Sequence, residues 1–180
     1  MNKIIIFLIT LFMALQISIL NAEDIDEDKT YNSDDLSTQY TFTDDNFGVT
    51  VTNNATLSRS QKLFIFDDAE RVGNSITVHS GSTLTTTGNG NTIFTDGAEL
   101  TITNSGTIST STNKSKAINI SKSDSVSITN NSGGVIRSGG NTILGTTSPG
   151  SDNTTIVNSG QIISTNSASS SSSISLSSSI

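Results

Sequence analysis

Short segments in which apolar and hydroxyl side chains alternate recur along the chain from Tyr40 onward. They lie at residues 49–51, 76–78, 100–102, 126–128 and 154–156, and they read VTV, ITV, LTI, VSI and TTI. Such alternation is typical of β-strands with one buried face, and these segments lack the spacing of an amphipathic helix. The pattern therefore predicts an all-β fold.

Two series of aliphatic residues recur with a single period. The first comprises Val51, Val78, Ile102, Ile128 and Ile156, and the second comprises Ile93, Ile118 and Ile143. The steps are 27, 24, 26 and 28 residues in the first series and 25 residues in the second. Periods of this length indicate stacked solenoid coils. We therefore expect a right-handed, single-stranded parallel β-helix of about 4–5 coils, with each series stacked inside it.

A turn motif recurs with the same period. It reads NSGTI at 104–108, NSGGVI at 131–136 and NSGQI at 158–162. Asparagine tolerates left-handed backbone angles and glycine adopts them freely, so the motif predicts a sharp corner between two strands. We also expect Asn104, Asn131 and Asn158 to stack at about 4.8 Å and to hydrogen-bond along the column.

Residues 1–22 have the composition of a secretory signal peptide. Lys3 is their only charged residue, an apolar run follows at residues 4–20, and Ala22 offers a small residue for cleavage. A retained membrane anchor is the alternative, because the run approaches the roughly 20 apolar residues of a spanning helix. Thr10, Gln16 and Ser18 interrupt the run, which favours cleavage.

The rest of the chain divides by composition into three parts. Residues 23–39 are acidic and poor in large apolar side chains, which predicts a disordered leader. Residues 40–163 carry the repeats, and the aromatic stretch at 63–66 should belong to a first coil or cap. Residues 164–180 are mostly serine, which predicts a flexible linker or a truncated end.

Charge and cysteine content narrow the classes of partner. Without Lys3 the chain has 8 basic and 16 acidic residues, a balance that disfavours binding to nucleic acid or anionic lipid. The chain has no cysteine, so the stacking of repeats must take the place of disulfides.

The sequence offers no residues that we would assign to catalysis, to a cofactor or to a metal ion. His79 is the only histidine and should face solvent after Val78, which leaves a transition-metal site or a serine-type triad without partners. Asp124 and Asp152 each precede a core isoleucine by four residues, so we expect them to stack roughly 5 Å apart. Carboxylate-pair hydrolysis or calcium binding could use that separation, but repulsion between like charges favours loop carboxylates.

Three further pairs of aspartates are interpreted as turn and solubility residues. They are Asp34 with Asp35, Asp44 with Asp45, and Asp67 with Asp68. Acidic side chains are common in turns because they hydrogen-bond nearby backbone groups.

A double row of hydroxyl residues is expected on the outer face of the strands. One row comprises Thr50, Thr77, Thr101, Ser127 and Thr155, and the next comprises Thr52, His79, Thr103, Thr129 and Val157. A flat double row of threonines resembles the ice-binding surface of some β-helical antifreeze proteins. His79 and Val157 interrupt it, and threonine is common on exposed strands, so a plain solvated face is the favoured interpretation.

The stretch LTITNSGTI at 100–108 and its echoes at 126–136 and 154–162, behind a signal peptide, resemble the passenger region of bacterial autotransporters. The resemblance covers roughly residues 47–163. It implies export to the surface of a Gram-negative bacterium through an outer-membrane translocator barrel. It also implies a structural or adhesive segment without catalysis, a surface or host glycan or protein as ligand, and self-association through an open carboxy-terminal coil.

Only 17 residues follow Ile163, whereas even an eight-stranded barrel needs on the order of 100. We therefore expect the translocator barrel to be absent from this chain. An extracellular polysaccharide lyase or hydrolase on the same fold is the alternative function. Few, scattered basic residues such as Arg59, Arg71 and Arg137 disfavour it.

Overall fold

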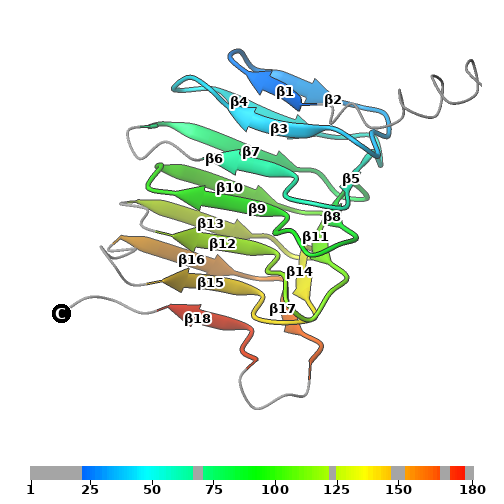
Figure 1. Ribbon diagram of the computed structural model, residues 1–180, viewed down its shortest axis with the longest axis vertical. Helices are drawn as coiled ribbons and strands as arrows, with labels where there is room; N and C mark the ends of the chain where they lie inside the picture. Colours follow the sequence, from blue (N-terminus) through cyan, green and yellow to red (C-terminus); the bar gives the residue numbers. More distant parts are fainter. Residues whose placement is uncertain (1–21, 67–70, 122–124, 147–152, 167–170, 177–180) are drawn as a thin grey trace, which may run out of the picture.

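The computed structural model describes residues 22–66, 71–121, 125–146, 153–166 and 171–176, and all regular structure in these ranges is β-strand. The predicted all-β, right-handed parallel β-helix is confirmed, because the strands stack in three parallel sheets that the chain visits in turn (Figure 1). The predicted signal peptide, except Ala22, lies outside the described residues.

The three sheets are designated A, B and C in the order in which each coil visits them. Sheet A contains β1 (Ala22–Ile25), β3 (Gln39–Phe42), β6 (Phe64–Phe66), β9 (Ile93–Asp96), β12 (Ile118–Ser121), β15 (Ile143–Thr146) and β18 (Ile174–Leu176). Sheet B contains β2 (Lys29–Tyr31), β4 (Gly48–Val51), β7 (Asn74–Val78), β10 (Leu100–Asn104), β13 (Val126–Asn130) and β16 (Thr154–Asn158). Sheet C contains β5 (Thr56–Arg59), β8 (Thr83–Thr86), β11 (Thr107–Thr110), β14 (Val135–Ser138) and β17 (Gln161–Ser164). Between β3 and β17 the chain therefore completes five three-strand coils, with β1, β2 and β18 at the ends.

Inward-facing columns of aliphatic and aromatic side chains fill the solenoid. The column of sheet A runs through Tyr40, Phe64, Ile93, Ile118, Ile143 and Ile174, and that of sheet C through Leu57, Leu84, Ile108, Ile136 and Ile162. The predicted series from Ile93 to Ile143 is confirmed by these pairings. Fully burying one such side chain stabilises the fold by about 1.5–3 kcal/mol, and only neighbouring coils can bury it.

The column of sheet B is confirmed in part. Ile128 pairs with Ile102 on one side and with Ile156 on the other, as predicted. Above Ile102 lies Ile76, whereas the predicted Val78 pairs with Asn104. Ile76 and Val78 are both buried, because strand side chains face inward at every second position. The prediction took the last apolar residue of each segment as the member of the column, and in β7 that residue is Val78, whereas Ile76 is the one that pairs with Ile102.

Buried asparagines continue the column that contains Val78. Asn104 Nδ2 donates to Asn130 Oδ1 at 2.8 Å, and Asn130 Nδ2 donates to Asn158 Oδ1 at 2.8 Å. The predicted ladder therefore exists, but its middle member is Asn130 instead of Asn131. The turn after β13 is longer than its neighbours, which leaves Asn131 half-buried with its Nδ2 on Ser105 Oγ at 3.0 Å.

Close stacking, and not a left-handed backbone angle, requires three of the turn glycines. Gly106, Gly134 and Gly160 have no positive φ, and neither do the ladder asparagines. A Cβ at each of these glycines would collide with backbone oxygens of the preceding coil or with a ladder asparagine. The predicted left-handed angle is therefore wrong for these three glycines, where the close approach of one turn to the next requires glycine. It is confirmed for Gly133 in the longer turn after β13, which has a φ of 85° and open space around it.

The acidic segment 23–39 is part of the solenoid, which corrects the expectation of a disordered leader. It carries β1 and β2, which pair with β3 and β4. Two aromatic stacks lie beneath: Tyr40 on Phe64 with centroids 5.0 Å apart, and Phe42 on Phe66 at 4.0 Å. Sequence composition missed these strands because their charged residues lie on an exposed edge, where charge prevents pairing with another chain.

Asp35 closes the same end of the stack. Its carboxylate accepts hydrogen bonds from the Tyr40 hydroxyl at 2.9 Å and from the Ser37 and Thr38 amides at 3.0 and 3.2 Å. Burial alone would raise the pKa of Asp35, but these hydrogen bonds outweigh it and hold the pKa below its ordinary value. The aromatic stretch at 63–66, predicted to belong to a first coil or cap, instead contains β6, which lies two strands in from β1 in sheet A.

The serine-rich segment 164–180 is also partly regular. β17 ends at Ser164, and β18 pairs with β15 through Ile143 and Ile174. A linker prediction from composition is therefore wrong for residues 174–176, where two apolar side chains suffice to extend sheet A.

We predict that Asn130→Ala lowers the free energy of unfolding by roughly 2–3 kcal/mol, because it removes one buried amide and leaves the Asn104 amide without its partner. Asn131→Ala is the matched control, and it should cost less than about 1 kcal/mol because its single side-chain bond is half-exposed. Urea unfolding followed by circular dichroism measures both variants. Equal losses would show that the ladder does not stabilise the stack.

Candidate functional site

The outer face of sheet B carries two rows of small polar residues in a register that differs from the prediction. One row comprises Thr30, Thr50, Thr77, Thr103, Thr129 and Val157, and the other comprises Gly48, Ser75, Thr101, Ser127 and Thr155. Thr77 pairs with Thr103 and not with Thr101, so the predicted rows slip by two residues between β7 and β10. His79 therefore leaves the row, and five threonines follow one another without interruption.

His79 is exposed just after β7, as predicted, and its amide donates to the Val51 carbonyl at 2.9 Å. The stacked pair predicted at Asp124 and Asp152 lies outside the described residues, as does the pair at 67 and 68. Among the described residues, no group of three or more metal-ligating side chains comes together. No helix within the described ranges is long and apolar enough to cross a bilayer.

The remaining predicted aspartate pairs join one coil to the next. Asp34 Oδ1 accepts a hydrogen bond from the Thr56 amide at 2.7 Å, and Asp45 Oδ1 accepts one from the Val72 amide at 3.1 Å. Asp44 Oδ1 accepts the Asp45 amide at 2.8 Å. These carboxylates act as turn residues, which agrees with their interpretation from sequence.

The two ends of the solenoid differ in chemistry. At the amino-terminal end, Glu23, Asp24 and Lys29 lie on β1 and β2 above the aromatic stacks. At the other end, β16, β17 and β18 each form the edge of a sheet, and four of their large apolar side chains are exposed, whereas Ile156 and Ile162 are half-buried against the core. The exposed fractions are 54% for Val157, 43% for Ile174, 42% for Leu176 and 36% for Ile163.

The asparagine ladder reaches this open end. Asn130 Nδ2 contacts both Asn158 Oδ1 and the Gln161 carbonyl of the next coil. Asn158 Nδ2 contacts only the Gly160 carbonyl of its own coil, at 3.3 Å. Asn158, the last asparagine of the ladder, therefore has the same side-chain amide through which Asn130 bonds the following coil.

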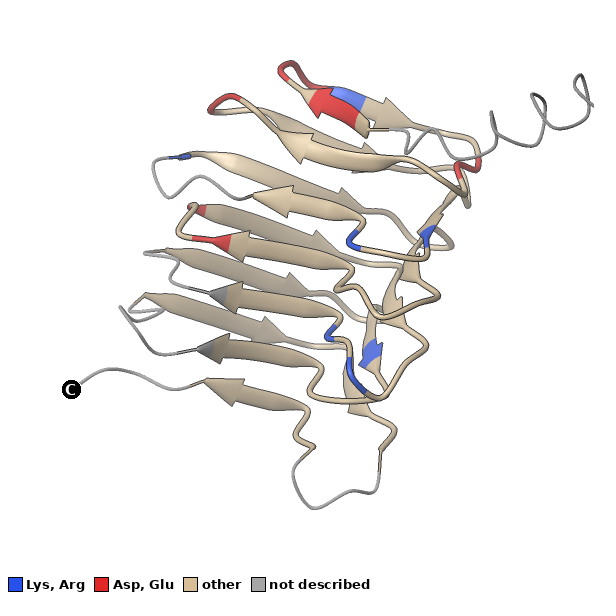
Figure 2. Cartoon of the chain, viewed as in Figure 1, with Lys and Arg blue, Asp and Glu red and all other residues tan. Residues whose placement is uncertain are grey.

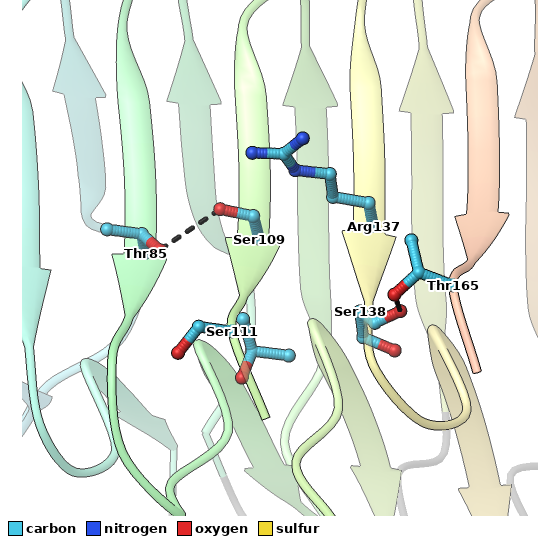
Figure 3. Close-up of a pocket in the computed structure, with 7 residues that line it drawn as sticks. Thr85, Ser109, Ser111, Arg137, Ser138 and Thr165 are labelled. Atoms are coloured by element: carbon cyan, nitrogen blue, oxygen red, sulfur yellow. Dashed lines mark hydrogen bonds between the residues drawn. The ribbon is translucent and has the colours of Figure 1, made fainter. Parts of the chain in front are cut away.

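Sheet C carries a groove of about 250 Å³ on its outer side (Figure 3). Six hydroxyl residues and one cation line it. Strands β8, β11 and β14 and the connections after β11 and β17 contribute them: Thr85, Ser109, Thr110, Ser111, Arg137, Ser138 and Thr165. In Figure 3 the Arg137 side chain extends from β14 toward β11, where Ser109 lies. Sequence reasoning missed this groove, because it treated these residues as ordinary strand and turn positions.

A row of polar side chains lies behind the groove, at the inner end of sheet C. Thr86 Oγ1 hydrogen-bonds Thr92 Oγ1 at 3.1 Å in one coil, and Ser138 Oγ lies 3.3 Å from Thr142 Oγ1 two coils later. In the coil between them, the Thr110 hydroxyl is buried and has no hydrogen-bond partner among the described residues.

The orphan hydroxyl has a simple cause in the sequence. Ala117 occupies the position that Thr92 and Thr142 fill in the neighbouring coils, since Ile118, the next residue, pairs with both Ile93 and Ile143. An alanine there supplies no oxygen to Thr110. A buried hydroxyl without a partner destabilises a fold by about 1–3 kcal/mol.

Charge is segregated around the axis of the solenoid (Figure 2). Acidic residues colour the amino-terminal coils and the corner between sheets A and B, whereas basic residues gather on sheet C and its connections to sheet A. Those connections contain Lys62, Lys114 and Lys116, and sheet C contains Arg59 and Arg137. Arg59 is only 4% exposed and donates to Gln39 Oε1 at 2.5 Å, so the other four make the accessible charge.

The comparisons find no matching family model, no similar curated protein and no similar solved structure. The functional interpretation therefore depends on the arrangement of this chain's own residues.

We predict that Ala117→Thr stabilises the protein relative to Ala117→Val by about 1–2 kcal/mol. The two side chains fill nearly the same volume, but only threonine supplies a hydroxyl to Thr110, in the arrangement of Thr86 with Thr92. Thermal unfolding of both variants measures the difference. A valine variant as stable as the threonine variant would show that Thr110 does not need a partner.

Proposed function

We propose that this chain is an exported β-helical segment displayed at the surface of a Gram-negative bacterium, with a structural or adhesive role and no catalytic one. The proposal keeps the resemblance of its repeats to autotransporter passengers and the signal-like residues 1–22. The observation that carries it is the difference between the two ends of the solenoid.

A stack with charged edge strands at one end and uncharged ones at the other suits a rod that is anchored or extended at the uncharged end. Charged edge strands at β1 and β2 discourage further pairing, while the uncharged edges of β16, β17 and β18 invite it. We infer that the open end contacts further coils, a second copy or a translocator barrel, in keeping with a passenger segment. Repeat stacks also fold by addition of coils to an existing end, which suits a chain that crosses a membrane unfolded.

The groove on sheet C supports a binding role better than an enzymatic one. Its lining has six hydroxyl residues and Arg137 but no carboxylate or histidine, the side chains that most often transfer protons in glycan cleavage. The lyase or hydrolase alternative would therefore need residues outside this groove.

We predict that expression of the full chain in a Gram-negative host yields an exported product that begins at Glu23, because Ala22 offers the cleavage position. Mass spectrometry of the product, combined with protease treatment of intact cells, measures processing and surface exposure. Ala22→Arg is the control, since a large charged side chain at this position should block cleavage. An unprocessed, cytoplasmic product in the wild type would contradict the proposal.

A second candidate function, ice binding, gains support from the corrected register of sheet B. Thr30, Thr50, Thr77, Thr103 and Thr129 follow one another along the sheet, at the spacing of about 4.8 Å that separates parallel strands. A flat, evenly spaced array of hydroxyl and methyl groups can match an ordered solid surface. The gap left by Gly48 in the second row makes this the weaker candidate.

Thermal hysteresis of the purified chain tests ice binding directly. If the array binds ice, Thr103→Tyr should abolish the hysteresis, because the large ring breaks the flat face. Thr107→Tyr on sheet C is the matched control and should retain it. Absence of hysteresis in the wild type would eliminate this candidate.

A further inference from the structure

We propose that the groove on sheet C binds a carboxylate-bearing sugar of an acidic polysaccharide, with Arg137 holding the carboxylate. The inference deepens the proposed function and rests on it, because an exported rod meets such polymers outside the cell. It names the chemistry of the ligand that an adhesive segment would take.

Arg137 is the only charged residue in the groove, and it is exposed. It lies between Ser109 of β11 and Ile163 of β17 in the sheet, so no acidic side chain flanks it across either neighbouring strand. The ion pairs of the described residues involve Lys29 and Arg71 and leave Arg137 free. A guanidinium presents a planar fork of donors that matches a carboxylate with two parallel hydrogen bonds.

The hydroxyls around Arg137 can complete the recognition of a sugar ring. Ser109 Oγ donates to Thr85 Oγ1 at 3.0 Å, which leaves the Thr85 hydrogen free to donate outward. Ser111 Oγ donates to the Thr87 carbonyl at 3.0 Å, and Thr165 Oγ1 donates to the Ser138 carbonyl at 3.1 Å. The last two oxygens therefore keep their lone pairs for sugar hydroxyls.

Size limits the groove to a small group. Its volume of about 250 Å³ lies below the roughly 300–1,000 Å³ of sites for drug-sized ligands, so one sugar ring is the fitting unit. Ser109 and Ser138 are 6% and 1% exposed, so the floor of the groove is held by buried residues of two adjacent strands. A groove open to solvent leaves room for the polymer to continue on either side.

The surrounding charge favours a polymer over a free sugar acid. Lys114 and Lys116 follow β11 in the connection to sheet A, the same connection that contributes Ser111 to the groove. Most acidic residues of the chain lie before residue 46, in the first coils. Charges separated by more than a Debye length, about 8–10 Å, are largely screened, so these acids do not cancel the local attraction.

A single-stranded nucleic acid is the other anionic polymer to consider. Proteins that bind one without sequence preference stack its bases on aromatic side chains. The groove has no aromatic residue, and its ring of hydroxyls suits sugar hydroxyls better than base faces. The polysaccharide is therefore the ligand that the lining favours.

Binding of the purified chain to polygalacturonate, measured by titration calorimetry at an ionic strength of about 0.15 M, tests the proposal. We expect Arg137→Gln to weaken binding by about tenfold, because it removes a charge-assisted, two-pronged hydrogen bond. Arg137→Lys should recover only part of the affinity, since an ammonium is a point charge without the planar fork. Neutral dextran should not bind, and a single-stranded oligonucleotide should bind more weakly than the polyuronate.

Arg71→Gln is the matched control, because it removes the same charge from the opposite corner between sheets A and B. Equal weakening by Arg71→Gln and Arg137→Gln would reduce the binding to general charge attraction and overturn the proposed site. Absence of polygalacturonate binding, tighter oligonucleotide binding, or equal competition by free galacturonate per sugar would also overturn it. Circular dichroism of each variant excludes misfolding as the cause. Because the assay uses purified protein, its failure would leave surface export untouched, and failed export would leave the binding result valid.

Discussion

Backbone hydrogen bonding between successive coils is the constraint on which the whole structure depends. Each strand pairs in parallel with the strand one coil before and one coil after it, so a residue's neighbours are about 26 positions away in sequence. A single coil cannot bury its aliphatic side chains or pair its own backbone, and it gains stability only within the stack. The asparagine ladder follows the same rule, because each amide needs its counterpart in the adjacent coil.

The same constraint determines which groups are exposed at the ends and on the outer faces of the solenoid. A stack of coils has two ends, and here they differ. Acidic edge strands and stacked aromatics lie at one end, and exposed Val157 and Ile174 lie at the other. Each coil contributes one residue to each position on an outer face. A residue type that recurs at the same position in successive coils therefore forms a row along the solenoid. Threonine makes such a row on sheet B, whereas sheet C breaks its row with Arg137 and forms a groove there.

Much of this architecture could be predicted from the sequence, because the period of about two dozen residues equals the number of residues in one coil. The column through Ile118 was predictable from Ile93 to Ile143, because each of these three coils contributes an isoleucine to it. The register between β7 and β10 was not, because a polar residue, Asn104, replaces an aliphatic one in a buried column. Because of that replacement, the observed pairing of His79 and the threonine rows differs from the predicted pairing by two residues.

Other features needed coordinates for different reasons. The acidic strands β1 and β2 resemble a disordered leader in composition, and only their pairing with aromatic coils reveals them. The groove depends on side chains from four successive coils, and these residues do not form a motif in any one segment of the sequence. The orphan hydroxyl of Thr110 likewise becomes visible only when Ala117 is compared with the residues stacked above and below it.

Cysteine cross-linking tests the register of the stack most directly, because the natural chain contains no cysteine. Thr77 and Thr103 are direct partners on adjacent strands, and parallel strands lie about 4.8 Å apart, within the range that a disulfide spans. We expect the double variant Thr77→Cys with Thr103→Cys to form an intramolecular disulfide on mild oxidation, and the double variant Thr77→Cys with Thr101→Cys not to form one. Preferential cross-linking of the second pair, or of neither, would contradict the stacked solenoid described here.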